Sequence, residues 1–246
     1  MTKSTIQQME EVSSILPRKV AIVMITRNSK EHIKSAINSI ISNTRYPHKL
    51  IIIEAESTDG TANICNQYAT VYPNIEVHHI KNIGPLKAIN YGLEVVKPYD
   101  VYLTHDDVIH PQLYRKDWLT EFVASAYKEN SAGATALNGF GVSGPDYIDN
   151  FQWIGTWSWY IRRRTIDKIG YFDENFGNGM GDDIDYSYRI FKAGLKMHVA
   201  EVYVEHHRMT GRSGSDVTEE AEKIKKKNAL YFRSKHKLGE FNDKEK

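Results

Sequence analysis

The first hundred residues alternate short apolar runs with stretches of helical periodicity, and this alternation limits the possible folds more than any other feature. Val20–Ile25 is an uninterrupted apolar run of strand length, and Leu50–Ile53 is a second. Ile75–Ile80, in which apolar and polar residues partly alternate, is expected as a third strand, and Val101–Leu103 is expected as a fourth. The first three of these strands are followed by segments whose apolar residues recur every three or four positions, as on one helix face. This order predicts an α/β fold with a Rossmann-like, mostly parallel central sheet flanked by helices.

The second half of the chain is less regular. Residues 111–129 have the pattern of a helix, and a stretch rich in glycine and aromatic residues follows at 139–159. A further helix is expected from about Asp182 to Gly194, because glycine suits the left-handed position after a helix. Residues 217–238 predict a basic C-terminal helix, since nine Lys and Arg oppose four Asp and Glu between positions 208 and 238.

Composition describes a globular chain of ordinary charge. The 246 residues are 41% hydrophobic and 26% charged, and the net charge is +1, which excludes a uniformly basic nucleic-acid-binding coat. The single cysteine, Cys65, excludes an internal disulfide framework. Val20–Ile25 is too short to span a bilayer. Residues 1–17 lack the pattern of a signal peptide, so a cytoplasmic location is expected.

We expect one main domain with two extensions. Residues 1–17 form a polar N-terminal tail, and residues 211–246 form a basic helical C-terminal extension. The domain spans residues 18–210, with a ligand-binding half at 18–107 and a second half at 108–210.

Polar and acidic side chains follow three of the predicted strands, at Thr26–Asn28, Glu54–Gly60 and His105–Asp107. Ligands of parallel sheets bind at the carboxyl ends of the strands, so these segments should share one rim. Paired carboxylates there suit Mg²⁺ or Mn²⁺, which also bind substrate phosphates. Alternatively, Asp106 and Asp107 could cap the helix after Pro111.

Five motifs in order then resemble one family. They are Val20–Asn28, Glu54–Thr61, Asn82–Gly92, Arg163–Glu174 and Gly181–Arg189. On these five motifs taken together, the chain resembles a family 2 glycosyltransferase of the GT-A fold, which transfers a sugar from a nucleotide-sugar donor. The resemblance implies a nucleotide-sugar-binding half at 18–107, a smaller acceptor and catalytic region, and inversion by direct displacement.

Two segments depart from the family pattern. Thr104 stands at the first acid of the Asp-x-Asp element, and Ala55 and Glu56 replace Asp and Gly after the second strand. Glu54 occupies a position where an acid usually meets the nucleotide base, and its longer side chain could alter base preference.

The resemblance implies a divalent metal held by Asp106, with Asp107 beside it at the nucleotide-sugar site, and by a histidine near the end of the domain. His206 and His207 follow an apolar-alternating strand, Val202–Val204. Alternation places the two rings on opposite faces, and His206 is the preferred ligand. A surface histidine pair at a strand end is the alternative.

The catalytic base should be a carboxylate within reach of the acceptor hydroxyl. Asp183 occupies the family position of that base, with Asp182 as its neighbour. Asp182, Asp183 and Asp185 could instead be acids favoured at a helix N-terminus. The glycine-rich approach from Phe176 to Gly181 favours a substrate site.

Further residues are candidates for substrate contacts. Those for the nucleoside are Thr26, Asn28, Glu54 and Asp59; those for the donor phosphate or sugar are Lys87 and Asn90; those for the acceptor side are Trp153, Trp157 and Trp159. Asp59 could be an ordinary turn residue, Asn90 could pack within its helix, and at least one tryptophan is expected in the core.

The leading hypothesis is therefore a metal-dependent glycosyltransferase that uses a nucleotide-diphosphate sugar, with uridine as the preferred nucleoside, and an acceptor hydroxyl on a glycan, a lipid-linked molecule or another compound. A non-catalytic nucleotide-sugar-binding module is the alternative, motivated by Thr104 and Ala55. A nucleic-acid acceptor is a third reading, motivated by the basic C-terminal segment, although a solvated, membrane-peripheral or dimer-forming helix would explain the same charge.

Overall fold

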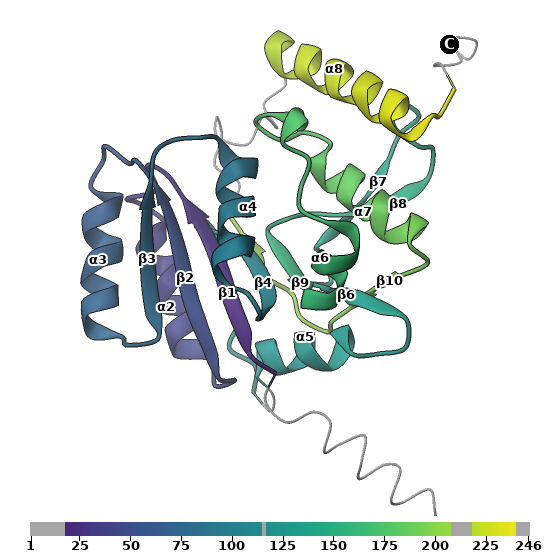
Figure 1. The fold of residues 1–246 in the computed structure, drawn as a ribbon. Coiled ribbons are helices and arrows are strands. Elements are labelled where there is room, and N and C mark those ends of the chain that lie inside the picture. The colour runs from purple at the N-terminus through teal and green to yellow at the C-terminus, as the bar shows by residue number, and fades with distance from the viewer. Residues whose placement is uncertain (1–17, 115–116, 208–217, 240–246) are drawn as a thin grey trace, which may run out of the picture.

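The computed structural model describes residues 18–114, 117–207 and 218–239. The expected N-terminal tail and the start of the expected C-terminal extension lie outside these ranges. A seven-stranded sheet in the order β10-β6-β9-β4-β1-β2-β3 forms the centre (Figure 1). Its strands are β1 (Val20–Thr26), β2 (His48–Ala55), β3 (Ile75–Ile80), β4 (Asp100–His105), β6 (Ser131–Thr135), β9 (Ser158–Ile161) and β10 (Lys196–Val199).

Strands β3, β2, β1 and β4 run parallel, as the first half of the sequence predicts. The continuous apolar runs have this form because both faces of the sheet are covered. Strand β9 lies antiparallel between β4 and β6, so the sheet is mostly parallel rather than wholly so. The carboxyl ends of β1, β2 and β4 therefore meet at one rim.

The two faces of β1 contact different helices. Val20, Ile22 and Met24 belong to one buried cluster, and Ala21 and Val23 belong to the other. The first cluster includes α2 (Ile33–Asn43), α3 (Thr61–Val71) and α5 (Trp118–Ala126); the second includes α4 (Pro85–Val95), α6 (Arg163–Ile169) and α7 (Asp182–Lys192). The result is a three-layer α/β/α arrangement.

Two expectations for the second half need correction. The helix expected at 111–129 is limited to α5, because the Asp117 side chain accepts hydrogen bonds from the first turn and caps the helix there. Val202–Val204 is not a strand. Instead, β11 (Glu205–His206) pairs with β5 (Val108–Ile109), directly after the predicted acidic segment. The remaining elements are β7 (Phe140–Ser143), β8 (Phe151–Ile154) and the 3₁₀ turn η1 (Glu174–Phe176).

The predicted basic helix is present as α8 (Glu219–His236), and Thr218 caps its first turn. Figure 1 shows α8 lying along one end of the molecule, beside the segment that leads into α7. Asn228, Ala229 and Phe232 are buried, and Phe232 joins the core cluster of α4 and α7. Helix α8 is therefore part of the packed fold. Among the described residues, none of the helices has the length and apolarity that a membrane crossing requires.

Candidate active site

The rim of the sheet brings the ends of β1 and β4 into direct contact. The Thr26 hydroxyl donates a 2.6 Å hydrogen bond to Asp106 Oδ2. Thr26 is only 3% exposed, so its hydroxyl serves mainly to hold Asp106 in place. Thr26 and Asp106, which are both predicted for the nucleotide-sugar site, are therefore in direct contact.

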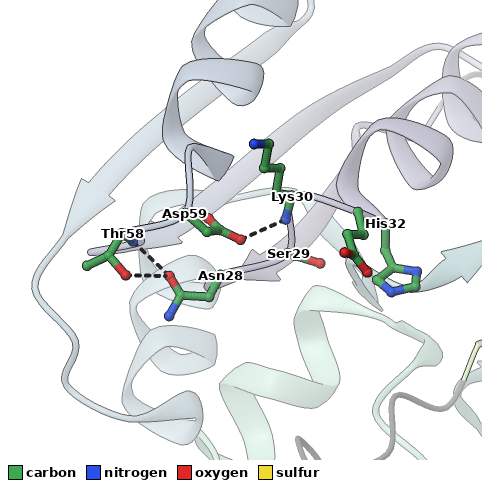
Figure 2. Close-up of a pocket in the computed structure, with 7 residues that line it drawn as sticks. Asn28, Ser29, Lys30, His32, Thr58 and Asp59 are labelled. Atoms are coloured by element: carbon green, nitrogen blue, oxygen red, sulfur yellow. Dashed lines mark hydrogen bonds between the residues drawn. The ribbon is translucent and has the colours of Figure 1, made fainter.

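Asn28 and Asp59 connect the first two loops of the rim. Asn28 has a left-handed backbone (φ 49°), and its Oδ1 accepts a 2.7 Å hydrogen bond from Thr58 N. Asp59 Oδ2 accepts a 2.9 Å bond from Lys30 N, as Figure 2 shows. Between these loops lies an open polar pocket of about 410 Å³. It is lined by Asn28, Ser29, Lys30, Glu31, His32, Thr58 and Asp59.

Glu54 stabilises the turn that contains Ser57. It is 3% exposed, and its two oxygens accept hydrogen bonds from Ser57 N (2.7 Å) and His79 Nδ1 (2.9 Å). Burial alone would raise the pKa of Glu54, but these hydrogen bonds lower it below its usual value. The carboxylate is therefore charged and already bonded within the protein. The neighbouring Glu56 is exposed, has a left-handed backbone (φ 53°) and accepts a 3.2 Å bond from Asn82 N.

The end of β4 and the short strand β11 form a cluster of metal-ligand groups. His105, Asp107 and His206 each place one ligand atom within 4.8 Å of the others. This corrects the expected pairing, because the structure places Asp107 rather than Asp106 beside His206. The physical reason is that Asp106 turns toward Thr26. His207 faces elsewhere and pairs with Glu205 at 2.9 Å.

The burial and the charges of this cluster suit a bound cation. Asp107 Oδ1 lies 3.4 Å from His206 Nε2, and it is buried without a hydrogen-bond partner among the described residues. Burial would raise the pKa of Asp107, but the two histidines lower it below its usual value. Burial lowers the pKa of His105 to about 4. At neutral pH, Asp107 is therefore ionised and His105 is neutral, which are the forms that bind metals.

One of the three predicted acceptor-side tryptophans, Trp157, contacts this cluster, and a second, Trp153, packs against Trp157. The Trp157 ring stacks on His206 with a centroid distance of 5.1 Å and an interplanar angle of 17°. Trp153 packs edge-on against Trp157 at 6.3 Å. Both are partly exposed. Trp159 is fully buried and bonds to Met197, so its assignment to the acceptor side is wrong. Strand β9 lies between β4 and β6 with both of its faces covered, so all four of its residues are buried.

The two candidates on α4 differ in exposure. Lys87 is exposed to solvent near the start of the helix. Asn90 is 8% exposed, and its carboxamide pairs with the backbone N–H and C=O of Phe172, each at 2.9 Å. Asn90 thus bonds to a distant segment rather than within its own helix, and it attaches α4 to the segment before η1.

The candidate base lies at the N-terminus of α7. Asp182 is 7% exposed, and Asp183 is partly exposed. Burial raises the pKa of both carboxyls, and the charge of Asp182 raises that of Asp183 further. Gly181 precedes the pair with φ 110°, and an added Cβ would lie 2.6 Å from the Tyr147 hydroxyl. The raised pKa means that the carboxylate forms of this pair are stronger bases than an ordinary aspartate, which suits proton abstraction once they are ionised.

Asp185, the third acid of this turn, has a different environment. It is fully buried and pairs with Arg189, Lys235 and His236. Sequence reasoning placed His105 at this rim without giving it a role, and it missed Tyr147 and Asn228. The role of His105 could have been found from its place beside the acidic pair, whereas Tyr147 and Asn228 carry no local signal.

Comparison with known proteins agrees with this geometry. The model of glycosyl transferase family 2 matches residues 21–181, more than half of the chain. YibD of Escherichia coli strain K12, described as an uncharacterized glycosyltransferase, is 30% identical over 97 residues, which cover 39% of this chain and 28% of YibD.

Solved structures establish the fold. GalNAc-T7, determined with UDP, GalNAc and Mn²⁺, superposes with a TM-score of 0.67 at 14% identity, covering 92% of this chain and 53% of its own. The mannosyltransferase PcManGT of Pyrobaculum calidifontis, determined with GDP-Man and Mn²⁺, has a TM-score of 0.66 at 16% identity, covering 92% of this chain and 66% of its own. These likenesses confirm the predicted GT-A fold. The family model that matches residues 21–181 shows that the chain belongs to glycosyl transferase family 2.

Proposed function

We propose that this protein transfers a glycosyl group from a nucleoside-diphosphate sugar to an acceptor hydroxyl, with a divalent cation and with inversion. The observation that carries the proposal is the His105–Asp107–His206 cluster at the rim where the β1, β2 and β4 loops meet. The predicted donor half at 18–107 and acceptor half at 108–210 are part of the same proposal.

The cluster fits a divalent cation. Asp107 Oδ1 is a charged, buried oxygen with no hydrogen-bond partner among the described residues, and such an atom is costly unless a cation satisfies it. Carboxylates suit Mg²⁺ and Mn²⁺, whereas imidazoles favour transition metals. The mixed set therefore favours Mn²⁺ over Mg²⁺. When bound, the cation supplies neutralising charge for the leaving diphosphate.

The carboxyl pair on α7 supplies the proton acceptor. In the proposed step, the acceptor oxygen bonds to the anomeric carbon while the bond from that carbon to the diphosphate oxygen breaks. The proton of the acceptor hydroxyl passes to Asp183, whose raised pKa matches this task. Attack from the face opposite the diphosphate inverts the configuration.

The loops at the ends of β1 and β2 provide the proposed donor pocket. Hydrogen bonds with Ser57 and Thr58 hold Asn28 in this pocket. Because Glu54 is buried, the nearest acid in the sequence that is exposed is Glu56. Uridine is the proposed nucleoside. Guanosine is the direct comparison, because PcManGT was solved with GDP-Man. The partly exposed Trp153 and Trp157 are proposed to face the acceptor.

Calorimetric titration of UDP and of GDP, each with Mn²⁺, Mg²⁺ or EDTA, tests the donor and metal assignments. We expect Mn²⁺-dependent binding that is lost in Asp107→Asn. The exposed Asp149 provides a matched control, because Asp149→Asn makes the same chemical change outside the site. Equal binding by wild type and Asp107→Asn would contradict the metal assignment.

Turnover separates an enzyme from a binding module. We expect slow metal-dependent hydrolysis of a UDP-sugar by the wild type and its loss in Asp183→Asn, with nucleotide binding retained. Binding without turnover for any donor, even with candidate acceptors present, would favour the module.

A nucleic-acid acceptor is not favoured, because several cations of α8 contact protein groups: Lys223 pairs with Glu219, and Lys225 pairs with Glu222.

A further inference from the structure

The segment that leads into the candidate base has an unusual backbone. Gly177, Gly179 and Gly181 have φ angles of 66°, 105° and 110°, and Met180 between them has a φ of 65°. A left-handed conformation is open to glycine but is strained for a residue that carries a Cβ. Such a conformation persists only where the surroundings hold it. The contacts around Met180 therefore decide whether this segment keeps its shape.

Those contacts come from α8. Asn228 is 3% exposed, and its Nδ2 donates to the carbonyls of Phe176 (3.2 Å), Gly179 (2.9 Å) and Met180 (3.0 Å). Because all three partners are carbonyl oxygens, the amide nitrogen must face them. The Tyr147 hydroxyl also donates to the Met180 carbonyl, at 3.2 Å. One side chain of α8 thus holds most of the segment before Asp182 and Asp183.

Helix α8 also contacts Asp185, which lies two residues after this pair. Lys235 Nζ and His236 Nε2 lie 2.7 and 2.8 Å from Asp185 Oδ1. At the start of η1, Asp173 Oδ2 accepts from the Tyr231 hydroxyl at 2.8 Å. The candidate base therefore lies between two points that are both attached to the same helix.

We propose that α8 is a positioning element of the catalytic site and that Asn228 is a positioning residue for Asp183. The proposal rests on the proposed role of Asp183 as base. Asn228 acts through the backbone of residues 176–180, which sets where the first turn of α7 points. A displacement of about 1 Å can cost as much as 100-fold in rate.

The alternative is that Asn228 contributes only to stability. The two roles differ in what they do to the kinetics of folded enzyme. The proposed donor pocket lies on the β1 and β2 loops, whereas the hydrogen bonds of Asn228 go to residues 176–180. A positioning role therefore lowers kcat and leaves the KM for the donor unchanged. A purely structural role changes the amount of folded enzyme and leaves both constants of the folded fraction unchanged.

Asn228→Asp is the sharpest variant, because it keeps the size of the side chain and replaces the donating NH₂ with an acceptor. Asn63→Asp on the exposed face of α3 makes the same change away from the site and serves as the control. We would measure hydrogen–deuterium exchange over residues 176–184, and kcat and donor KM with UDP-sugars. All measurements use full-length protein below the melting temperature of each variant.

The expected result is faster exchange across residues 176–184 and a 10- to 100-fold lower kcat in Asn228→Asp, with an unchanged donor KM. Asn63→Asp should match the wild type. If Asn228→Asp does not fold, Asn228→Ala is read by the same criteria. Unchanged exchange, or a changed KM with wild-type kcat, would overturn the proposal.

A failure of the proposed function would look different. It would be a wild type that neither binds UDP or GDP nor turns over any sugar nucleotide, and that result would remove the catalytic role of Asn228 as well. Unchanged exchange in Asn228→Asp removes the positioning role while leaving wild-type turnover intact.

Discussion

Asp185 is the carboxylate whose removal is expected to destabilise this protein most. It is fully buried, and Arg189 Nε reaches Oδ2 at 2.9 Å. Lys235 and His236 reach Oδ1 at 2.7 and 2.8 Å. Asp185→Asn keeps the shape of the side chain but leaves these groups without their anionic partner.

Breaking a buried ion pair from one side costs about 3–5 kcal/mol. We expect the lower end, about 3 kcal/mol, because the cations retain other partners. Arg189 keeps the carbonyls of Ile169 and Tyr171, and Lys235 keeps Asp173. At about 2–4 °C per kcal/mol for a chain of this size, the melting temperature should fall by about 6–12 °C.

The pH dependence of this loss follows from the direction of the pKa shift. Burial would raise the pKa of Asp185, but the hydrogen bond from His236 and the charges of Arg189 and Lys235 lower it below its usual value. A carboxyl with a lowered folded-state pKa stabilises the fold above its unfolded pKa of about 3.9, and it loses that contribution as the pH falls through the folded pKa. The difference between wild type and Asp185→Asn should therefore be full at pH 7 and shrink below about pH 4.

Urea unfolding at pH 7 and at decreasing pH, followed by circular dichroism, measures this difference. Asp149→Asn provides the exposed control and should change stability by less than about 0.5 kcal/mol. A loss in Asp185→Asn no larger than that of the control, or a loss that grows as the pH falls, would refute the reasoning.

Three further outcomes are expected. Asp182→Asn removes a charge that raises the pKa of the candidate base, so the acidic limb of kcat/KM against pH should move to lower pH, and an unmoved limb would contradict the coupling. Trp159→Ala should cost about 3–5 kcal/mol in urea unfolding, and Trp153→Ala should cost less because its indole is partly exposed; equal losses would contradict the burial argument. Gly155→Ala would place a Cβ 1.8 Å from the Trp157 indole, which stacks on His206, so calorimetry should give weaker binding of Mn²⁺ at the proposed site, whereas Gly144→Ala, with nothing within 4 Å, should bind like the wild type.

The parallel half of the fold could be predicted because its signals are local. Each apolar run indicates a strand that is buried on both faces, and each periodic segment indicates which face of its helix packs against the sheet. Strands β1 to β4 accordingly lie within a few residues of their predicted bounds. The second half was harder to predict because short antiparallel strands such as β9 and β11 depend on partners elsewhere in the chain.

Part of the candidate site could likewise be predicted from the sequence, and part could not. The order of motifs located the acidic end of β4, the histidine pair and the carboxylates of α7 without any structure. The sequence could not decide that Asp107 faces His206 while Asp106 faces Thr26, because the direction of adjacent side chains in a turn depends on the pairing of β5 with β11.

By itself, the sequence determined the family, the parallel core and the short segments that carry the chemistry, because periodicity and spacing are properties of neighbouring residues. Only the tertiary structure decided that Trp159 is in the core, that Glu54 and Asn90 are bonded within the protein, and that Asn228 holds the approach to Asp183. These roles arise from contacts between residues far apart in the chain, and burial and hydrogen bonding at such contacts leave no periodic trace in the sequence.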